Sequence, residues 1–247
     1  QDCASRAPIN ILESKFTYAL FTHKLKPENE AWLKEKGYVD GKVKFSDAYI
    51  AVKSGTTRTG NSLKAPLQAI HEFGLVPKKL LPLLPTMTWE GYHNPKRITS
   101  EIEALGKEFS RRFTINYDQA TESQFEVLLK DDFLDVGGHA WSTPINGEYP
   151  RTDLKFNHAF ALWKTPRFFA FDNYLDAVDG DFVKKLAPNY DLMDYGYRVF
   201  VSRENVPQEI NSNIPYWVEL IKGFWATFFR IKKDAEAILP KPTPTLD

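Results

Sequence analysis

The sequence is poor in cysteine, in net charge and in long apolar runs, and each shortage excludes a class of protein. One cysteine among 247 residues excludes an internal disulfide and favours a reducing compartment. Lysine plus arginine equals aspartate plus glutamate, at 32 each, so no excess charge predicts a nucleic-acid partner. No apolar run is long enough to span a bilayer, and no signal peptide is visible. We therefore expect an intracellular rather than a secreted protein.

Ligand patterns for metals and cofactors are missing as well. No pair of His, Cys, Asp or Glu has the spacing of metal ligands, so we expect no metal site. The polar loop at residues 54–62 contains two glycines but does not fit a phosphate-binding loop. The sequence therefore predicts a protein without a cofactor.

The residues that are present can bury a sizeable core, since 43% are apolar and 14% aromatic. Helical spacing of apolar residues predicts helices from residue 9 onward and over 28–36, 63–73, 96–112 and 119–129. Ser46 is the expected N-cap of a further segment at 45–52, and Gly74 is expected to end the helix at 63–73. Short β-type runs at 113–117, at 133–136 and around His158 and Phe169 predict strands. The front half is thus helical and the back half strand-rich. We expect an α+β chain of two lobes with a boundary near residue 112.

A histidine opens one of these strand-like runs. His158 begins the run at 158–163, a short turn follows at 164–167, and a second run delivers Asp172 and Asn173. Two antiparallel strands joined by that turn would place His158 beside one of these two side chains. Either could orient the imidazole and leave its other nitrogen free. A competing histidine, His139, has no acidic partner on a following strand, so we interpret it as a structural or cleft-wall residue.

The single thiol lies at the far end of the chain from this histidine. Cys3 precedes the predicted helix from residue 9, whose first turn suits Pro8. The positive end of a helix dipole favours a thiolate there. A lone cysteine can equally be a small buried apolar residue. The pattern as a whole indicates a Cys-His-Asp/Asn hydrolase site assembled from Cys3, His158 and Asp172 or Asn173.

Two further segments are candidates for binding. The glycines of the loop at 54–62 would let its backbone approach an extended peptide, and an ordinary surface turn is the alternative interpretation. Residues 214–239 have an aromatic stripe at helical spacing, interrupted by charges and too short to cross a membrane. Packing against the protein's own lobes is our first interpretation of this stripe. Docking on a partner protein or on a membrane surface is the alternative, and the aromatic residues concerned are Trp217, Phe224, Trp225 and Phe228.

The order of these features resembles the papain-like cysteine proteases, in particular divergent members from bacteriophages and other viruses. Cys3 precedes a helix with Glu13 ten residues on, as in the family's nucleophile helix. Segments 45–61 and 70–77 are similar to the family's stretch from its Ser-x-x-x helix through the glycine loop to a Gly-(Ile/Leu)-x-Pro turn. The triplet at 157–159 matches the family's Asn-His-Ala, and 171–174 lies where the family has Asn-Ser-Trp. Cys3 and His158 are about 155 residues apart, close to the roughly 130–150 of such enzymes.

The resemblance implies a papain-like two-lobed fold that hydrolyses peptide bonds of a peptide or protein substrate. A helical lobe at 1–112 would carry the nucleophile, a β-rich lobe at 113–212 the histidine, and 213–247 an extra C-terminal aromatic helix and a proline-rich tail. Cys3, His158 and Asp172 or Asn173 would be catalytic. Gln1 would supply the hydrogen-bond donor to the oxyanion, although we expect an upstream segment that held a better donor. The residues of the substrate cleft would be Gly60, Asn61 and Trp141.

Three features depart from the family pattern and keep other functions open. Ala4 replaces the aromatic residue after the cysteine, Gln1 lies only two residues before Cys3, and Pro8 falls inside the family's helix. A catalytically inactive papain-fold component of a virus particle is therefore the main alternative, so we expect an intracellular or virion-associated protein rather than a secreted one. In it the C-terminal helix would dock on a virion or host protein. A different thiol hydrolase, amidase-like or transglutaminase-like, is the third hypothesis.

Overall fold

The computed structural model describes residues 2–84, 86–152, 155–164, 168–172 and 182–202. The chain divides into two compact units, residues 1–212 and 213–247. The second unit lies outside the described residues, and with it the predicted aromatic helix with Trp217, Phe224, Trp225 and Phe228. Among the described residues, no helix has the length and apolarity that crossing a membrane requires.

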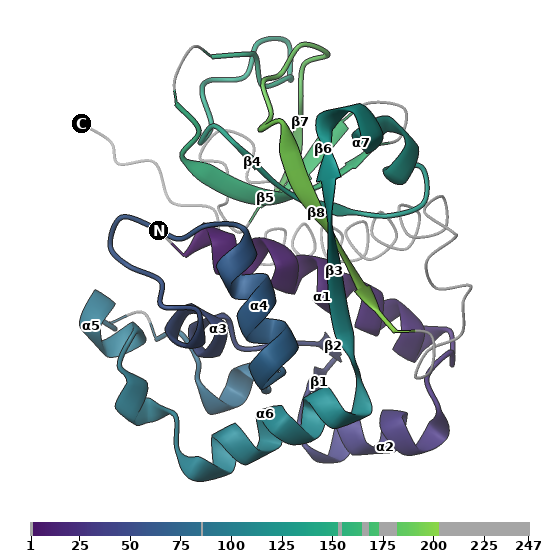
Figure 1. The fold of residues 1–247 in the computed structure, drawn as a ribbon, viewed down its shortest axis with the longest axis vertical. Helices are drawn as coiled ribbons and strands as arrows, with labels where there is room; N and C mark the ends of the chain where they lie inside the picture. The colour runs from purple at the N-terminus through teal and green to yellow at the C-terminus, as the bar shows by residue number, and fades with distance from the viewer. Residues whose placement is uncertain (1, 85, 153–154, 165–167, 173–181, 203–247) are drawn as a thin grey trace, which may run out of the picture. The chain divides into compact units, whose positions relative to one another are not determined.

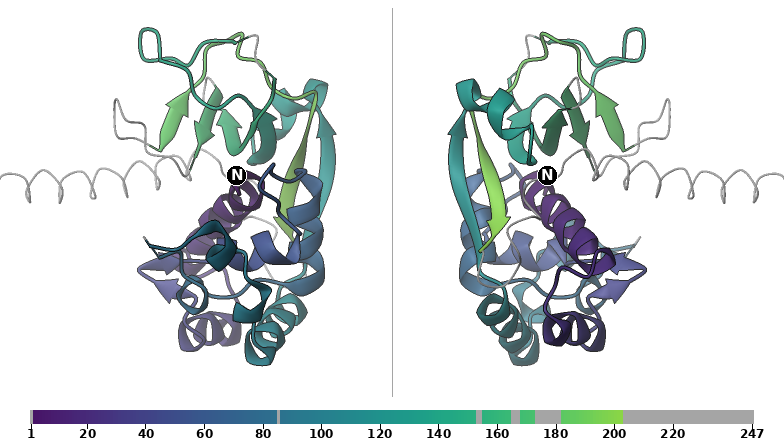
Figure 2. Two further views of the ribbon diagram at one scale, coloured as in Figure 1. Left: turned by 90° about the vertical axis from the view of Figure 1, so that its left-hand side faces the viewer. Right: turned by 90° about the vertical axis from the view of Figure 1, so that its right-hand side faces the viewer.

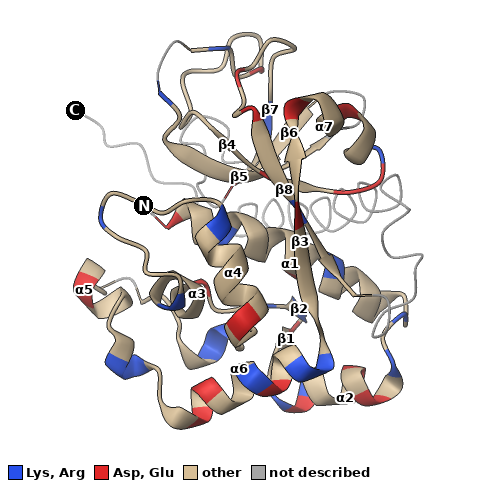
Figure 3. Cartoon of the chain, in the orientation of Figure 1, with Lys and Arg blue, Asp and Glu red and all other residues tan. Residues whose placement is uncertain are grey.

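Helices make up the part of the chain before residue 113 (Figure 1). The connections between the helices contain two short 3-10 turns, η1 (Lys78–Leu80) and η2 (Pro95–Arg97). They also contain a small hairpin of two-residue strands, β1 (Val39–Asp40) and β2 (Lys42–Val43). The helices are α1 (Cys3–Phe21), α2 (Pro27–Glu35), α3 (Asp47–Lys53), α4 (Lys64–Phe73), α5 (Trp89–Tyr92) and α6 (Ser100–Arg112). Charged residues of both signs lie along α2 and α6, acidic in the first turn and basic in the last turn of each helix (Figure 3).

The central helix starts earlier than its sequence predicts. α1 begins at Cys3 and contains Pro8 in its interior, whereas the proline suggested a first turn near residue 9. Pro8 lacks an N–H and removes one hydrogen bond of the helix. Burial on almost every side compensates for this loss, because Leu12 is fully buried and Phe16 is 1% exposed. Tertiary packing thus overrides the local signal, and the helix has no single apolar stripe.

Aromatic rings around Phe16 form the core of the helical part. The Phe16 ring packs on Phe45, Phe109 and Phe113 at centroid distances of 5.5, 5.6 and 5.0 Å. The rings of Phe45 and Phe113 both meet Phe16 edge-on, a favoured geometry. Burying each phenylalanine contributes roughly 1.5–3 kcal/mol. This cluster holds α1 against the segment before α3 and against α6.

Local signals fix several helix ends as the sequence predicts. The Ser46 hydroxyl accepts the Tyr49 N–H at 3.2 Å, which confirms the predicted cap of α3. Gly74, with φ +70°, ends α4 as predicted. A Cβ on Gly74 would lie 2.0 Å from the Gly106 carbonyl oxygen, so the glycine also lets α4 and α6 approach closely. The start of α6 was misplaced, because the chain turns through η2 and Thr99 then caps the helix.

A six-stranded antiparallel sheet follows, in the order β3-β8-β4-β5-β6-β7. Figure 2 shows the molecule from two further sides. One helix, α7 (Glu122–Leu128), lies between β3 and β4 in the sequence. The helix predicted at 119–129 was therefore too long. β3 continues to Thr121 because all seven of its residues pair with β8. The strands are β3 (Ile115–Thr121), β4 (Leu134–Gly138), β5 (His158–Lys164), β6 (Phe168–Phe171), β7 (Val183–Lys185) and β8 (Tyr195–Val201).

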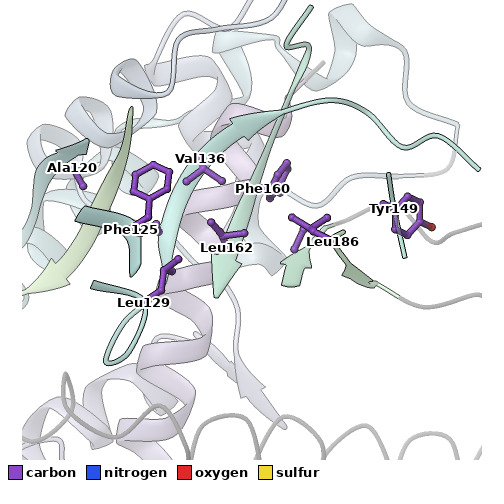
Figure 4. Packing of buried hydrophobic residues seen from close by; sticks show 10 residues of the cluster. Ala120, Phe125, Leu129, Val136, Tyr149, Phe160, Leu162 and Leu186 are labelled. Carbon is purple, nitrogen blue, oxygen red and sulfur yellow. The ribbon is translucent and has the colours of Figure 1, made fainter. Parts of the chain in front are cut away.

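The two faces of this sheet have different partners. Alternate residues of β4 and β5, among them Val136, Phe160 and Leu162, enter an apolar cluster with α7 (Figure 4). The residues between them, Ala159 and Ala161, turn to the other face, where α1 packs on β5. Their small side chains allow the helix to lie close to the strand. This close packing brings the first residue of α1 beside the start of β5.

Buried charges also join α1 to the sheet at Lys15, far along the helix from Cys3. The Lys15 ammonium is 2.6 Å from an Asp132 carboxylate oxygen and donates to the Val199 carbonyl oxygen, also at 2.6 Å. Arg198 on β8 pairs with the same Asp132 at 2.9 Å. Since Lys15 and Asp132 are 3% exposed, the pair is shielded from solvent. It fixes the position of α1 along the sheet.

Candidate active site

The thiol of Cys3 stands at the N-terminus of α1, and its residue is partly exposed. The N–H groups of a first helical turn have no acceptor within the helix. The preceding residue, Asp2, uses its carboxylate to pair with Arg6 at 2.7 Å rather than to cap the helix. Arg6 also reaches Asp47 on α3 at 3.0 Å. These pairs fix the turn that carries the thiol.

The imidazole of His158 lies next to this thiol, although about 155 residues separate the two in sequence. The Cys3 sulfur is hydrogen-bonded to the His158 ring and also receives the Ala159 backbone N–H. His158 is the first residue of β5, the strand on which α1 packs. The packing of α1 on β5 therefore brings the thiol and the imidazole together.

A carboxylate holds the other side of the ring. His158 Nε2 is 2.9 Å from Asp172 Oδ2, and the two residues are 8% and 2% exposed. Asp172 directly follows β6, which pairs with β5 in antiparallel register. Because Nε2 binds the carboxylate, Nδ1 is the nitrogen left to face the sulfur. Asn173 and Gln1 lie outside the described residues.

The ionisation of this pair is shifted toward the charged form. Burial alone would lower the pKa of His158, but its hydrogen bonds to Asp172 and Cys3 raise that pKa to about 9. Burial likewise acts to raise the pKa of the Cys3 thiol, and the hydrogen bond and charge of His158 outweigh it, so the pKa is lowered. Both shifts favour a thiolate beside an imidazolium.

Trp141, predicted as a wall of the cleft, contacts the carboxylate of Asp172. Its indole Nε1–H donates to Asp172 Oδ2, the oxygen that also binds His158. The Trp141 ring meets the His158 ring edge-on, with centroids 5.7 Å apart and an interplanar angle of 84°. Contact with substrate stays a prediction for this residue. Its contact with Asp172 could not be predicted, because the two residues come from different loops.

The predicted binding residues of the loop at 54–62 are largely occupied within the loop itself. The Asn61 amide donates to Ser54 and, at 3.1 Å, to the Thr56 hydroxyl, which in turn lies 3.3 Å from the Ser5 hydroxyl on α1. The Gly60 N–H donates to the Thr57 carbonyl oxygen at 3.0 Å. The Gly60 carbonyl oxygen accepts the Thr57 N–H at 3.2 Å and the Thr57 hydroxyl at 3.0 Å, so the predicted pairing of Gly60 with a peptide would have to replace one of these bonds. The loop is anchored to α1 two residues from the thiol.

One residue near the thiol was missed by the sequence reasoning. Asp135 on β4 is fully buried, and neither carboxylate oxygen has a hydrogen-bond partner in the described part of the chain. Burial, and secondarily the charge of Cys3, raise the pKa of Asp135 well above its usual value. Its position in the sequence could have indicated this. Asp135 lies between the apolar residues Leu134 and Val136, so alternation along the strand turns its side chain to the face opposite the apolar cluster. His139, interpreted as structural, is 1% exposed.

The comparisons with known proteins concern the fold. No protein-family model matches the chain, and no curated protein matches its sequence. The structure is similar to that of xylellain, a cysteine protease from Xylella fastidiosa, with a TM-score of 0.56 and 13% sequence identity. The match covers 82% of this chain and 80% of that one. The chain thus has a papain-like fold of mixed helix and sheet, and the bacteriophage or viral type stays a prediction.

Proposed function

We propose that the protein is a papain-like cysteine peptidase in which Cys3 is the nucleophile, His158 the acid and base, and Asp172 the orienting group. The observation that carries the proposal is the continuous chain of hydrogen bonds from the Cys3 sulfur through His158 to Asp172. It occurs in a chain whose fold is similar to that of a cysteine protease. Neither the sequence spacing nor the fold likeness alone would support the assignment of these residues.

The chemistry follows from the positions of these groups. The Cys3 proton moves to His158, and the thiolate attacks the carbonyl carbon of the peptide bond. His158 then protonates the leaving amine, which leaves a thioester on Cys3. A water molecule gives a proton to His158 and attacks the thioester, and the thiolate departs. Asp172 keeps the imidazole oriented and stabilises its positive charge throughout.

The negative oxygen of the tetrahedral intermediate requires hydrogen-bond donors. The Cys3 backbone N–H lies at the start of α1, without an acceptor inside the helix, and is the first donor. The second donor proposed from the sequence is the Gln1 side chain. Each such donor is commonly worth about 3 kcal/mol of transition-state stabilisation.

Hydrolysis of a library of internally quenched peptides tests the proposal. Wild type should cleave members of the library, whereas C3A and H158A should not. A matched control is H23A, because His23 is exposed and distant in sequence from the other groups, and its activity should equal that of wild type. Activity should fall as pH rises through about 9, where His158 loses the proton that the leaving amine needs. Undiminished cleavage by C3A would remove the proposed nucleophile.

A further inference from the structure

The carboxylate of Asp172 receives two hydrogen bonds on a single oxygen. One comes from His158 Nε2 at 2.9 Å and the other from Trp141 Nε1. Asp172 is 2% exposed, so solvent replaces neither donor readily. The indole nitrogen of Trp141 can donate a hydrogen bond but cannot accept one. It therefore suits an ionised carboxylate, which only accepts hydrogen bonds.

Packing holds the Trp141 ring in place over this carboxylate. The ring contacts Phe160 on β5 and Tyr149 at centroid distances of 5.1 and 5.2 Å. The ammonium of Lys184, a residue that is 1% exposed, lies 5.6 Å from the Trp141 ring centre and 5.7 Å from that of Tyr149. Tyr149 in turn donates its N–H to the Lys185 carbonyl oxygen on β7 at 2.8 Å. The indole is thus fixed by β5 and β7.

These contacts give the indole a defined effect on the imidazole. A hydrogen bond to a carboxylate stabilises its ionised form. An ionised and fixed Asp172 keeps the imidazolium proton on His158 and holds Nδ1 toward Cys3. The bond between His158 and Asp172 is shielded from water, since the two residues are 8% and 2% exposed. Loss of the indole N–H would weaken the thiolate-imidazolium pair without removing any of its members.

We propose that Trp141 is a positioning residue for the Cys3–His158 pair and acts through its N–H on Asp172. The inference rests on the proposed function. It differs from the sequence-based prediction, in which Trp141 is a wall of the substrate cleft. A wall contributes to substrate binding and so to KM, whereas a positioning residue contributes to kcat and to the reactivity of the thiol in the absence of substrate.

Alkylation by iodoacetamide measures that reactivity directly, because Cys3 is the only cysteine. In W141F the midpoint of the alkylation rate against pH should rise by about one unit, so that at low pH about tenfold less thiolate is present. kcat should fall by a similar factor while KM stays near its wild-type value. The matched control is W163F, since Trp163 is a tryptophan of β5 that is 6% exposed and stacked on Phe169. Its profile should equal that of wild type.

A second variant pair shows whether the effect passes through the carboxylate. W141F in a D172A background should leave the D172A profile unchanged, because the acceptor of the N–H is gone. An equal shift in both backgrounds would mean that Trp141 acts only by packing and would overturn the inference. If W141F does not fold, benzothienylalanine at position 141 keeps the ring shape and lacks the N–H, and it should give the same shift.

The outcomes for the inference and for the proposed function are separate. Suppose that the alkylation midpoint of wild type is depressed and that W141F and the benzothienylalanine protein have the same midpoint. This result would refute the inference and leave the peptidase proposal standing. A wild-type midpoint near the ordinary thiol value of about 8.5 would refute both. A raised KM with an unchanged kcat and an unchanged midpoint would assign Trp141 to the substrate cleft.

Discussion

Asp135 provides a quantitative test of the structure, because it is a buried acid without a hydrogen-bond partner in the described part of the chain. The residue is fully buried, and neither oxygen has a hydrogen-bond partner among the described residues. Burial, with a smaller contribution from Cys3, raises the pKa of its carboxyl well above the usual value. The folded protein therefore retains a proton that the unfolded chain loses near pH 4. Stability from this group is complete below that pH and declines as pH rises toward the folded-state pKa.

The size of the decline follows from linkage. While the folded state holds one proton more than the unfolded state, the free energy of unfolding falls by about 1.4 kcal/mol per pH unit. Between pH 5 and pH 7 this amounts to about 2.7 kcal/mol, provided that the buried acid keeps its proton. D135N has a side chain of the same size that does not ionise. Its advantage over wild type should therefore grow with pH by this amount.

Urea unfolding at a series of pH values measures the difference. Wild type and D135N should differ least near pH 4 and increasingly above it, with similar m-values. D118N is the matched control, because Asp118 is an exposed aspartate on a strand of the same sheet, and its curve should run parallel to that of wild type. Parallel curves for D135N as well would show that Asp135 is ionised or solvated in the folded state, and the described packing around it would be wrong.

Two further predictions concern buried charges elsewhere. K15M should lower the free energy of unfolding in urea by about 3 kcal/mol, because it leaves the buried Asp132 carboxylate without its ammonium; K34M removes an equally short but exposed pair and should cost less than about 0.5 kcal/mol. Equal losses in the two variants would contradict the burial of Lys15. E13Q should be less sensitive to pH than wild type, since burial raises the pKa of Glu13 to about 7 although it accepts the Phe45 N–H. The contribution of Glu13 to the free energy of unfolding of wild type is lost as pH rises toward 7. An equal dependence of that free energy on pH in E13Q would refute this prediction.

The sequence predicted the order of elements well because most of the signals are local. The cap at Ser46 and the stop at Gly74 depend on neighbouring residues, and both were confirmed. The start of α1 and the length of β3 were not predicted, because burial of α1 and pairing of β3 with β8 decide them. Such long-range packing leaves no periodic signal in the segment itself.

The candidate site shows the same division. His158 could be placed beside Asp172 or Asn173 from the sequence, because one turn joins the two strands, but the choice between these two residues could not be made. Cys3 was added because it is the single thiol of the sequence, and the family resemblance supported it, since no local signal links the two ends of the chain. The indole of Trp141 and the carboxyl of Asp135 were out of reach, because their roles depend on which loop and which strand face the site.

The central claim is that the Cys3 thiol is ionised by His158, and the pH profile of Cys3 alkylation tests it most directly. Wild type should reach its maximal rate with a midpoint below the ordinary thiol value of about 8.5. In H158A the midpoint should return toward that value, because the hydrogen bond and the charge of the imidazole are gone. Identical profiles for the two proteins, both with midpoints near 8.5, would contradict the claim.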